Sequence, residues 1–290
     1  MTRTVAVCGS VNMDTFVRTG HFPAAGETVI ASPNGQALGG KGANQAVAAA
    51  RFLQGRDARV VLHATVGRDA DGDRAVAELR DAGVDVSAVA RTRDAPTGQA
   101  FIMNDGTGEN IIVVTSGANE VTDPAGVDGA ADVLLAQGEL TPAHSAALPA
   151  LAARLGARFV LNLAPVTTRD PDLVAAADPL VLNETEAAEL APDGDPSHLA
   201  RSVLVTLGAH GAVLYEGAER TDIPPRPVAE VVDTTGAGDA FCGTLAAALA
   251  EGASLVDAAE VATAAGSLAV RSRGASASYA SRAEILHLAG

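Results

Sequence analysis

Short apolar runs rich in Val, Leu and Ile alternate with longer alanine-rich stretches along most of the 290-residue chain. The short runs predict β-strands at residues 4–8, 60–65, 133–136, 158–163, 180–182, 203–206 and 212–215. The longer stretches predict α-helices at residues 43–53, 71–81, 143–155, 184–190, 239–250 and 255–270. Continuously apolar strands separated by helices indicate a mainly parallel sheet with helices on both faces, so we expect a three-layer α/β/α core.

Two segments break this alternation. Residues 15–32 contain Gly20, Pro23 and Gly26 between β-rich positions, and residues 99–115 have the pattern of a hairpin around Asn104-Asp105-Gly106. Asn and Gly tolerate the positive φ that such turns require. We expect these segments, about residues 13–34 and 97–115, to form a small antiparallel β-sheet lid inserted in a single domain over residues 1–290. The alternative is an extension of the main sheet at one edge.

Composition narrows the classes of partner and compartment. The net charge is −15, from 20 Lys and Arg against 35 Asp and Glu, which argues against binding to nucleic acid or anionic membranes. The two cysteines, Cys8 and Cys242, make neither a disulfide framework nor a zinc set. The apolar run at residues 5–8 is too short for a signal peptide, and no stretch approaches the roughly 20 apolar residues of a membrane helix. We therefore expect a globular protein of the reducing cytoplasm.

Lys41 is the only lysine of the chain, and it lies in the glycine-rich segment Gly39-Gly40-Lys41-Gly42. The segment nearly matches the phosphate-binding P-loop, but Gly42 stands where that loop needs a Ser or Thr hydroxyl for Mg²⁺. What remains is a glycine-rich turn that opens a helix and carries Lys41 and Asn44 as donors. Such a loop suits a polyhydroxylated ligand, and a tight turn with a solvated lysine is the alternative.

A second glycine-rich segment, Gly236-Ala237-Gly238-Asp239, precedes an apolar helix near the C-terminus. It does not match the dinucleotide fingerprint, because Phe241 occupies the third glycine position. Unpaired N–H groups at a helix N-terminus stabilise an anion, so the segment suits phosphate chemistry. A carboxylate at that site, Asp239, could take a proton from an attacking hydroxyl. Asp239 could equally serve only to stabilise the first turn of the helix.

Two further segments follow predicted strands, where ligands of open α/β sheets bind. The first contains Asn183 and Glu186, and the second contains Thr206, Gly208 and Gly211. Each segment alone is more often a turn or a cap. The series Asp69-x-Asp71-x-Asp73 lacks the Gly and distal Glu of a calcium-binding EF-hand loop, so it predicts a solvated loop and a helix start. The histidines show no metal-binding spacing.

Taken together and in this order, the motifs resemble those of the ribokinase family of carbohydrate kinases, from about residue 5 to residue 281. The matching segments are residues 9–14, Pro23-x-x-Gly26-Glu27-Thr28, residues 39–46, Gly106-x-Gly108-Glu109-Asn110, residues 183–187, Thr206-Leu207-Gly208, residues 233–239 and Arg273-Gly274-Ala275. The two glycine-rich segments carry most of the resemblance. The sequence departs from the family pattern at two places. The connection at residues 191–202 is short and leaves little room for a helix, and Ala277 stands where a proline is common.

The resemblance implies a role for each matching residue. Asp239 would deprotonate the acceptor hydroxyl, and Gly236, Ala237 and Gly238 would form the anion hole for the γ-phosphate. The sugar hydroxyls would be held by Asn12, Asp14, Gly40, Lys41, Asn44 and Glu139. ATP would lie against Asn183, Thr206, Gly208, Gly211 and Gly238, with Thr263 at the adenine. Glu186 would place Mg²⁺ through water, and a monovalent cation, K⁺, would be held by Asp233, Thr235, Ala269, Ser272, Gly274 and Ser278.

The activity that the resemblance implies is ATP-dependent phosphorylation of D-ribose at its 5-hydroxyl, by an enzyme that dimerises through the lid. This chemistry requires mainly in-line positioning and charge stabilisation. The nearest alternative is a kinase on the same scaffold that acts on a nucleoside, a ketohexose or a keto-deoxy sugar acid. A sugar sensor without catalysis is a further alternative, which the presence of Asp239 and of the intact glycines disfavours.

Overall fold

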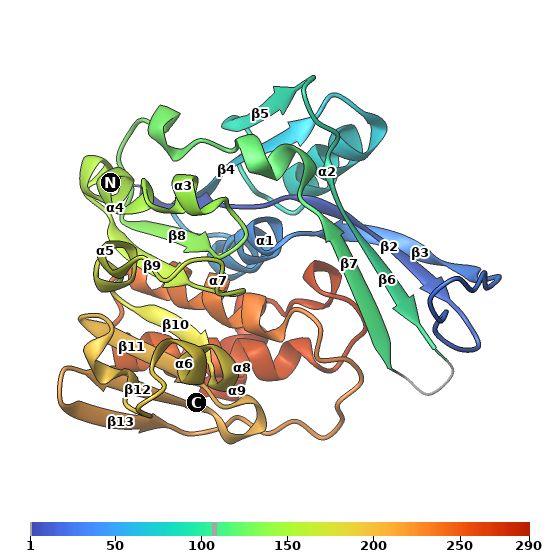
Figure 1. Cartoon of the computed structure of the whole chain (residues 1–290). Helices are drawn as coiled ribbons and strands as arrows, with labels where there is room; N and C mark the ends of the chain where they lie inside the picture. The colour runs from blue at the N-terminus through green and yellow to red at the C-terminus, as the bar shows by residue number, and fades with distance from the viewer. Residues whose placement is uncertain (1, 106–108) are drawn as a thin grey trace.

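The computed structural model describes residues 2–105 and 109–290. Within these residues the main sheet has nine strands, in the order β13-β12-β11-β10-β9-β8-β1-β4-β5 (Figure 1). Their bounds are β1 (Arg3–Cys8), β4 (Ala58–Gly67), β5 (Val89–Thr92), β8 (Val133–Gln137), β9 (Arg158–Asn162), β10 (Leu180–Asn183), β11 (Ser202–Thr206), β12 (Ala212–Glu216) and β13 (Glu219–Ile223). From β5 along this order to β11, each pair of neighbouring strands is parallel. Strand β12 pairs antiparallel with both β11 and β13.

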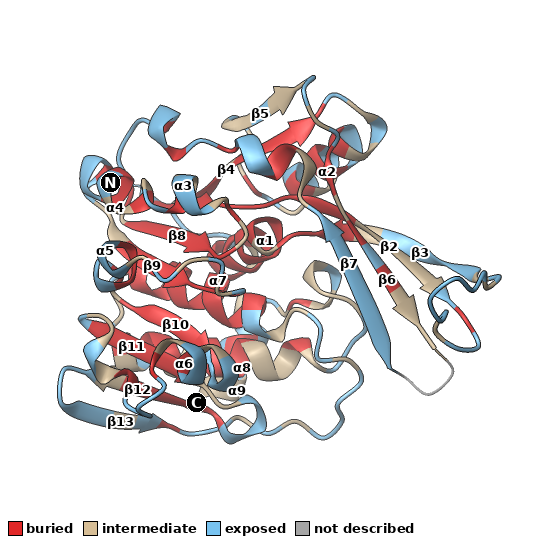
Figure 2. Ribbon diagram, in the orientation of Figure 1, coloured by how far each residue is buried: buried red, intermediate tan, exposed pale blue. Residues whose placement is uncertain are grey.

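Helices cover both faces of this sheet, as the alternation predicted. One apolar cluster joins the sheet to α1 (Lys41–Leu53), α2 (Ala70–Asp81), α7 (Ala237–Ala250), α8 (Leu255–Ala269) and α9 (Arg282–Ala289). A second cluster joins the opposite face to α4 (Leu148–Leu155), α5 (Pro171–Ala175) and α6 (Glu184–Leu190). In β8, Val133 and Leu135 belong to the first cluster, and Leu134 and Ala136 to the second. Both faces of the sheet are therefore buried (Figure 2), and the three-layer α/β/α prediction is confirmed.

Some elements differ from the sequence-based prediction. The helix expected at residues 143–155 is divided into α3 (Pro142–Ser145) and α4, because Pro149 in the first turn of α4 has no N–H to continue a helix from Ser145. Strands β5 and β13 and helices α5 and α9 were not predicted. The connection at residues 191–202 contains a 3₁₀ turn, Pro196–His198, and no α-helix. The other 3₁₀ turns are Gly117–Val121, Pro124–Gly126, Gly208–His210 and Ser276–Ser278. In the described part of the chain, no helix has the length and apolarity needed to cross a membrane.

A second, four-stranded sheet projects from one side of the core (Figure 1) and does not extend the main sheet. It consists of β2 (Asn12–Arg18), β3 (Ser32–Gly39), β6 (Gly98–Asn104) and β7 (Asn110–Thr115), in the order β3-β2-β6-β7. The prediction of a wholly antiparallel lid is wrong, because β2 and β6 pair in parallel. Both strands leave the core in the same direction, so they can pair with each other only in parallel. Gly106 of the predicted turn and Gly108 of the quoted motif lie outside the described residues.

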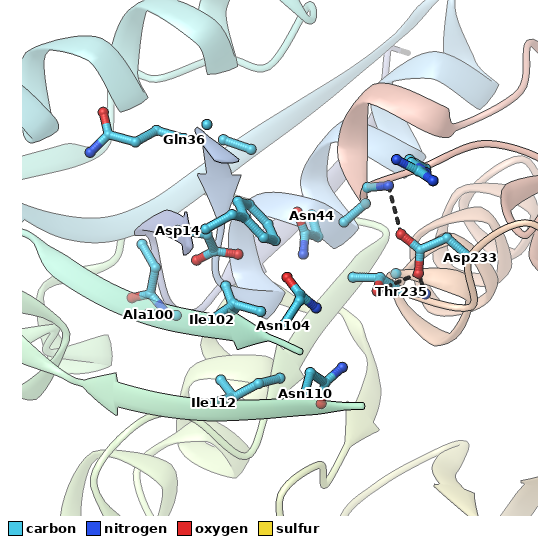
Figure 3. A pocket seen from close by; sticks show the side chains of 18 of the residues that line it. Asp14, Gln36, Asn44, Ala100, Ile102, Asn104, Asn110, Ile112, Asp233 and Thr235 are labelled. Atoms are coloured by element: carbon cyan, nitrogen blue, oxygen red, sulfur yellow. Dashed lines mark hydrogen bonds between the residues drawn. The ribbon is translucent and has the colours of Figure 1, made fainter. Parts of the chain in front are cut away.

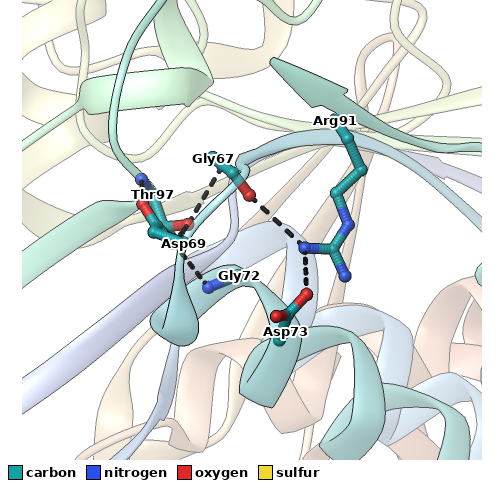
Figure 4. Close-up of polar contacts among 6 residues, drawn as sticks. All are labelled: Gly67, Asp69, Gly72, Asp73, Arg91 and Thr97. Carbon is teal, nitrogen blue, oxygen red and sulfur yellow. Dashed lines mark hydrogen bonds and ion pairs between the residues drawn. The ribbon is translucent and has the colours of Figure 1, made fainter. Parts of the chain in front are cut away.

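Hydrogen bonds around Asp69 anchor the small sheet where β6 begins (Figure 4). The carboxylate caps α2 by accepting from Gly72 N–H at 2.8 Å, and it also accepts from Thr97 N–H at 2.8 Å and Thr97 Oγ1–H at 2.6 Å. Thr97 Oγ1 in turn accepts from Gly67 N–H at the end of β4. Burial opposes the charged form of Asp69, but these bonds outweigh it and lower its pKa. The predicted helix start at Asp69 is confirmed, and the same side chain ties the small sheet to the core.

Helices α1 and α7 pack very closely. A Cβ added at Gly243 of α7 would lie 2.3 Å from the carbonyl oxygen of Gln45 and 2.6 Å from Cβ of Ala48, both in α1. Only glycine fits at this contact. Asp239 lies four residues before Gly243, on the same side of the helix. The close approach therefore brings the start of α7 against the start of α1, and the two glycine-rich segments of the sequence meet there.

Candidate active site

A cavity of about 1090 Å³ lies between the small sheet and the N-termini of α1 and α7. Figure 3 shows Asp233 and Thr235 across this cavity from Ala100, Ile102 and Ile112 of the small sheet. The residues predicted from sequence that line it are Asn12, Asp14, Gly40, Lys41, Asn44, Glu139, Asp233, Thr235, Gly236, Asp239 and Gly274. Segments separated by more than 200 residues of sequence therefore share one cavity.

Asp239 lies in the first turn of α7 and is buried. Its Oδ2 accepts a hydrogen bond from Asn44 Nδ2 at 3.0 Å, and its Oδ1 accepts from Gln45 Nε2 at 2.9 Å. The carboxylate does not close a capping bond on its own helix, since α7 begins at Gly236 without a side-chain cap. The simple capping interpretation of Asp239 therefore does not describe its hydrogen bonds. The carboxylate is held at the cavity wall by amide donors from α1.

Lys41 begins α1 and extends beside the acidic groups of the cavity. Its pKa is raised, above all by the negative charge of Asp239, while burial acts in the opposite direction and Glu139 adds to the increase. The ammonium therefore stays charged although it is largely enclosed. The backbone also excludes a P-loop, because residues 35–39, which would form the first part of such a loop before Lys41, lie within strand β3.

Asp14 lies on β2 and faces the same cavity. Burial, together with the charges of Glu139 and Asp239, raises the pKa of Asp14 to about 7. Its Oδ1 is buried and has no hydrogen-bond partner among the described residues, and the same is true of Asn44 Oδ1. Two acceptor oxygens of residues that line the cavity are thus buried without donors, which is costly unless a ligand supplies them.

Glu139 is positioned by two residues of the matching motifs, and Asn12 by Asn119, which lies outside them. Glu139 Oε2 accepts from Lys41 N–H at 2.9 Å and from the hydroxyl of Ser10. Asn12 Oδ1 accepts from Asn119 Nδ2 at 2.8 Å. Gly40 has a positive φ of 85°, and a Cβ there would lie 2.9 Å from Asn12 N and Ser10 O. The turn before α1 therefore requires glycine for backbone packing alone.

The start of α7 has the form of an anion site. Gly236 has a φ of 77°, and an added Cβ would lie 2.7 Å from Ala275 and 2.9 Å from the Tyr279 hydroxyl. The N–H groups of Gly238 and Asp239 belong to the first turn, where a helix offers no internal acceptor. The expectation that Ala237 also presents a free N–H is wrong in this structure, because that group donates to Thr234 O at 3.3 Å.

The residues expected to bind ATP lie around the ends of β10 and β11. Asn183 and Glu186 form a reciprocal capping box at the start of α6, with both hydrogen bonds at 2.8 Å. Burial raises the pKa of Glu186. Thr206 ends β11, and Gly208 is exposed in the following 3₁₀ turn.

Gly211 and Thr263 have structural explanations of their own. A Cβ at Gly211 would lie 2.2 Å from Ile223 O, so contact with β13 already requires a glycine there. Thr263 is buried in α8 and donates to Ala259 O at 2.8 Å. Neither residue is among those lining the cavity described above, and neither are Asn183, Glu186, Thr206 and Gly208.

The segments expected to bind a monovalent cation are joined by hydrogen bonds. Asp233 Oδ2 accepts from Gly274 N–H at 2.9 Å, and Oδ1 accepts from the Thr235 N–H and hydroxyl. Burial opposes ionisation of Asp233, but these bonds outweigh it and lower its pKa. Ala269 is buried at the end of α8, Ser272 is exposed, and the Ser278 hydroxyl donates to Ala275 O. Within residues 2–105 and 109–290, no group of three or more His, Cys, Asp or Glu has a metal-binding arrangement.

Three buried amides at this site were missed from sequence. Gln45, Gln137 and Asn162 are each 7% exposed or less, and they form hydrogen bonds behind Asp239. Gln137 and Asn162 each end a parallel strand after an apolar run. Polar residues at that position favour a ligand site, and this rule, which was applied to Asn183, would have found them.

Comparison with known proteins places these features in one family. The model of the pfkB family of carbohydrate kinases matches residues 2–282. The chain belongs to this family. It is 34% identical to the ribokinase of Bacillus subtilis over 99% of both chains, and 32% identical to that of Schizosaccharomyces pombe over 97% and 96%. The structure of Arabidopsis thaliana ribokinase with ribose and ATP superposes with a TM-score of 0.89 at 29% identity, covering 100% of this chain and 99% of that chain.

Membership of the pfkB family confirms the resemblance expected from the motifs. The neighbours also include an archaeal nucleoside kinase from Methanocaldococcus jannaschii with a TM-score of 0.85, but at 18% identity it shows the shared fold alone.

Proposed function

We propose that this pfkB-family kinase transfers the γ-phosphoryl group of ATP to the 5-hydroxyl of D-ribose, giving ribose 5-phosphate and ADP. The observation that carries this proposal is a single cavity in which Asp239, at the start of α7, faces the polar groups Asp14, Lys41 and Asn44. The full-length similarity to curated ribokinases supports the choice of ribose and ATP.

The sugar subsite follows from unsatisfied acceptors. Asp14 Oδ1 and Asn44 Oδ1 are buried without partners among the described residues, and a sugar hydroxyl is a suitable donor for each. Lys41 and the amide of Asn12 add donors to hydroxyl oxygens, and Glu139 and the backbone of Gly40 complete the wall. A site of this kind discriminates strongly against sugars lacking one hydroxyl, because a buried polar group would then lose its partner.

Asp239 would act as the general base. Its carboxylate is fixed by Asn44 and Gln45, and it lies in the first turn of α7 beside the proposed phosphate position. The 5-hydroxyl would give its proton to Asp239 as its oxygen attacks the γ-phosphorus, and the bond from phosphorus to the ADP oxygen would break. The N–H groups of Gly238 and Asp239 and the charge of Lys41 would stabilise the negative charge on the transferred group.

The nucleotide would lie along the ends of β10 and β11, against Asn183, Thr206, Gly208 and Gly211, with Thr263 nearest the adenine. Glu186 supplies one carboxylate close to this site, which fits Mg²⁺, a cation commonly held by one or two carboxylates, water and phosphate. Bound Mg²⁺ would neutralise charge on the phosphate oxygens.

A K⁺ site would involve Asp233 and oxygen atoms of Thr235, Ala269, Ser272, Gly274 and Ser278. The lowered pKa of Asp233 supports a permanently charged ligand there, and hydrogen bonds between residues 232–235 and 270–274 hold the two segments together. This oxygen-only set fits a hard cation. The segment is continuous with Gly236, so a bound cation would act on the anion hole through the backbone.

Two further proposals concern assembly and location. Strand β7 is exposed along its whole length, and Phe101, Ile111 and Val113 are each at least 44% exposed. Such an apolar surface supports a homodimer formed through the small sheet.

Both cysteines are free and buried, and burial raises the pKa of Cys8 to about 12. Cysteines without a disulfide support a location in the reducing cytoplasm.

The function is tested by ATP consumption with D-ribose, 2-deoxyribose, fructose, adenosine and pseudouridine, each with and without K⁺. We expect D-ribose to give the highest kcat/KM, with ribose 5-phosphate as the product. A higher kcat/KM with a nucleoside or fructose would replace ribose as the substrate. Sugar binding without ATP consumption by any acceptor would indicate a sensor and refute the kinase proposal.

A further inference from the structure

Behind Asp239 lies a chain of three buried amides that does not line the cavity. Gln45 Nε2 donates both to Asp239 Oδ1 at 2.9 Å and to Asn162 Oδ1 at 3.0 Å. Gln137 Nε2 donates to Gln45 Oε1 at 2.8 Å, and Asn162 Nδ2 donates to Val181 O at 3.2 Å. Gln45 and Gln137 are at most 1% exposed, and Asn162 is 7% exposed. The chain thus runs from the centre of the main sheet to the catalytic carboxylate.

The direction of every hydrogen bond in this chain follows from one backbone group. The Val181 carbonyl can only accept, so Asn162 must turn its NH₂ toward β10 and its oxygen toward Gln45. Gln45 must then present its NH₂ to Asn162, and the same NH₂ reaches Asp239. Its oxygen is left facing the NH₂ of Gln137. Strands β8, β9 and β10 therefore determine that Asp239 receives a donor and never an opposing oxygen.

We propose that Gln45, oriented by Gln137 and Asn162, is a positioning residue that holds the general base Asp239 in its charged form and in one rotamer. The inference rests on the proposed function, because it assigns the role of base to Asp239. Asn44 also contacts this carboxylate, but it lines the cavity and its oxygen has no partner among the described residues, so it can respond to the sugar. Gln45 has its acceptor and donor groups engaged inside the protein, so its hold does not depend on the ligand.

This assignment predicts a loss of catalysis that differs from a loss of sugar binding. Without the Gln45 donor, the carboxylate loses a charge-assisted hydrogen bond and its charged form becomes less favourable. The same loss allows the side chain to rotate, and small misplacements of a catalytic group reduce the rate on the order of 10²-fold. The sugar contacts of Asp14, Asn12 and Glu139 do not involve Gln45.

The experiment compares Gln45→Met, Gln137→Met and Gln54→Met. All three make the same change of side chain, and Gln54 lies exposed at the C-terminal end of α1, away from the site. At saturating ribose and ATP, we expect kcat of Gln45→Met to fall about 10- to 100-fold, while the KM for ribose stays within about threefold. The acidic limb of its kcat–pH profile should move to higher pH, because the carboxylate loses a donor. Gln137→Met should change kcat and the acidic limb of the kcat–pH profile in the same direction but to a smaller extent. Gln54→Met should match the wild type in both.

The outcomes separate this inference from the proposed function. A kcat–pH profile of Gln45→Met that superimposes on that of the wild type, whatever its thermal stability, would overturn the inference. If ribose is not the best acceptor, the same comparison is made with the acceptor that is. If nothing is phosphorylated, the proposed function has failed. The ¹³C NMR spectrum of labelled aspartate, assigned with Asp239→Asn, then decides, because Gln45→Met must change the carboxylate signal of Asp239 while Gln54→Met leaves it in place, and an unchanged signal would overturn the inference.

Discussion

Replacement of Asp14 by asparagine should stabilise the unliganded protein, and the gain should grow with pH. Asp14 faces the cavity beside Glu139 and Asp239, and its pKa is raised from 3.8 to about 7 by burial and by those two charges. The folded state therefore binds this proton more tightly than the unfolded state. Stability due to this group is full below pH 3.8 and declines as the pH rises to about 7, after which it stays constant.

The size of the effect follows from the two pKa values. At about 1.4 kcal/mol per pKa unit, the stability due to Asp14 is lower than at low pH by about 4 kcal/mol at pH 8 and by about 2 kcal/mol at pH 5. Asparagine does not titrate. The difference in unfolding free energy between Asp14→Asn and the wild type should therefore be about 2–3 kcal/mol larger at pH 8 than at pH 5.

Urea denaturation of both proteins at the two pH values, without sugar or nucleotide, measures this difference. Titrating groups that do not interact with Asp14 are shared by the two proteins and cancel in the comparison, and the coupling to Glu139 and Asp239 belongs to the measured effect. Asp128→Asn, which removes one exposed aspartate, serves as the control for loss of a charge. If the Asp14→Asn difference is the same at pH 5 and pH 8, the carboxylate is not held in an unfavourable charged state, and the reasoning is refuted.

Three further predictions test the site directly. Asp239→Asn should lower kcat on the order of 10²-fold or more while ribose binding, measured by calorimetry, is largely kept, and near-normal turnover would remove Asp239 from the role of base. The rate should rise when K⁺ replaces Na⁺ or choline in the assay buffer, and an unchanged rate after thorough removal of K⁺ would argue against a cation at Asp233. Gly236→Ala should lower the free energy of unfolding by about 1–3 kcal/mol, because φ is 77° and the new Cβ meets Ala275 and Tyr279. Gly238→Ala, where a Cβ meets nothing within 4 Å, is the matched control for stability and should lose nothing in the same urea titration.

The elements that the sequence predicts well are those whose burial is uniform. Strands β1, β8, β9 and β11 are buried on both faces, so continuous apolar runs mark them clearly. Strand β13 has the sequence Glu-Arg-Thr-Asp-Ile and is mostly exposed at the edge, so no apolar run marks it. Its place depends on pairing with β12. Helix α9 did have a signal, since Ser281 and Glu284 spell a capping box that the structure contains.

The sequence predicted which residues line the site better than it predicted the hydrogen bonds between them. Motifs identified Asp239, Lys41 and Asn44, and the structure places all three around one cavity. No motif could show that Gln45 lies against Asp239, because that contact depends on how closely α1 and α7 pack at Gly243. The N–H of Ala237 was assigned wrongly for a related reason. A helix start can close a tighter turn, here with Thr234, and only the backbone conformation decides which N–H groups remain free.

The proposed role of Lys41 would explain how a strongly acidic chain can act on a phosphate group. Asp14, Glu139 and Asp239 bring three carboxylates to one cavity, and the positive charge of Lys41 is maintained there chiefly by Asp239. In the proposed reaction Asp239 is neutralised when it takes the hydroxyl proton, so Lys41 loses its strongest electrostatic partner at that moment. Negative charge is then developing on the transferred phosphoryl group, and Lys41 can shift its interaction to it. The base and the lysine would therefore work as a coupled pair, and the net charge of −15 of the whole chain would not prevent binding of an anion at this position.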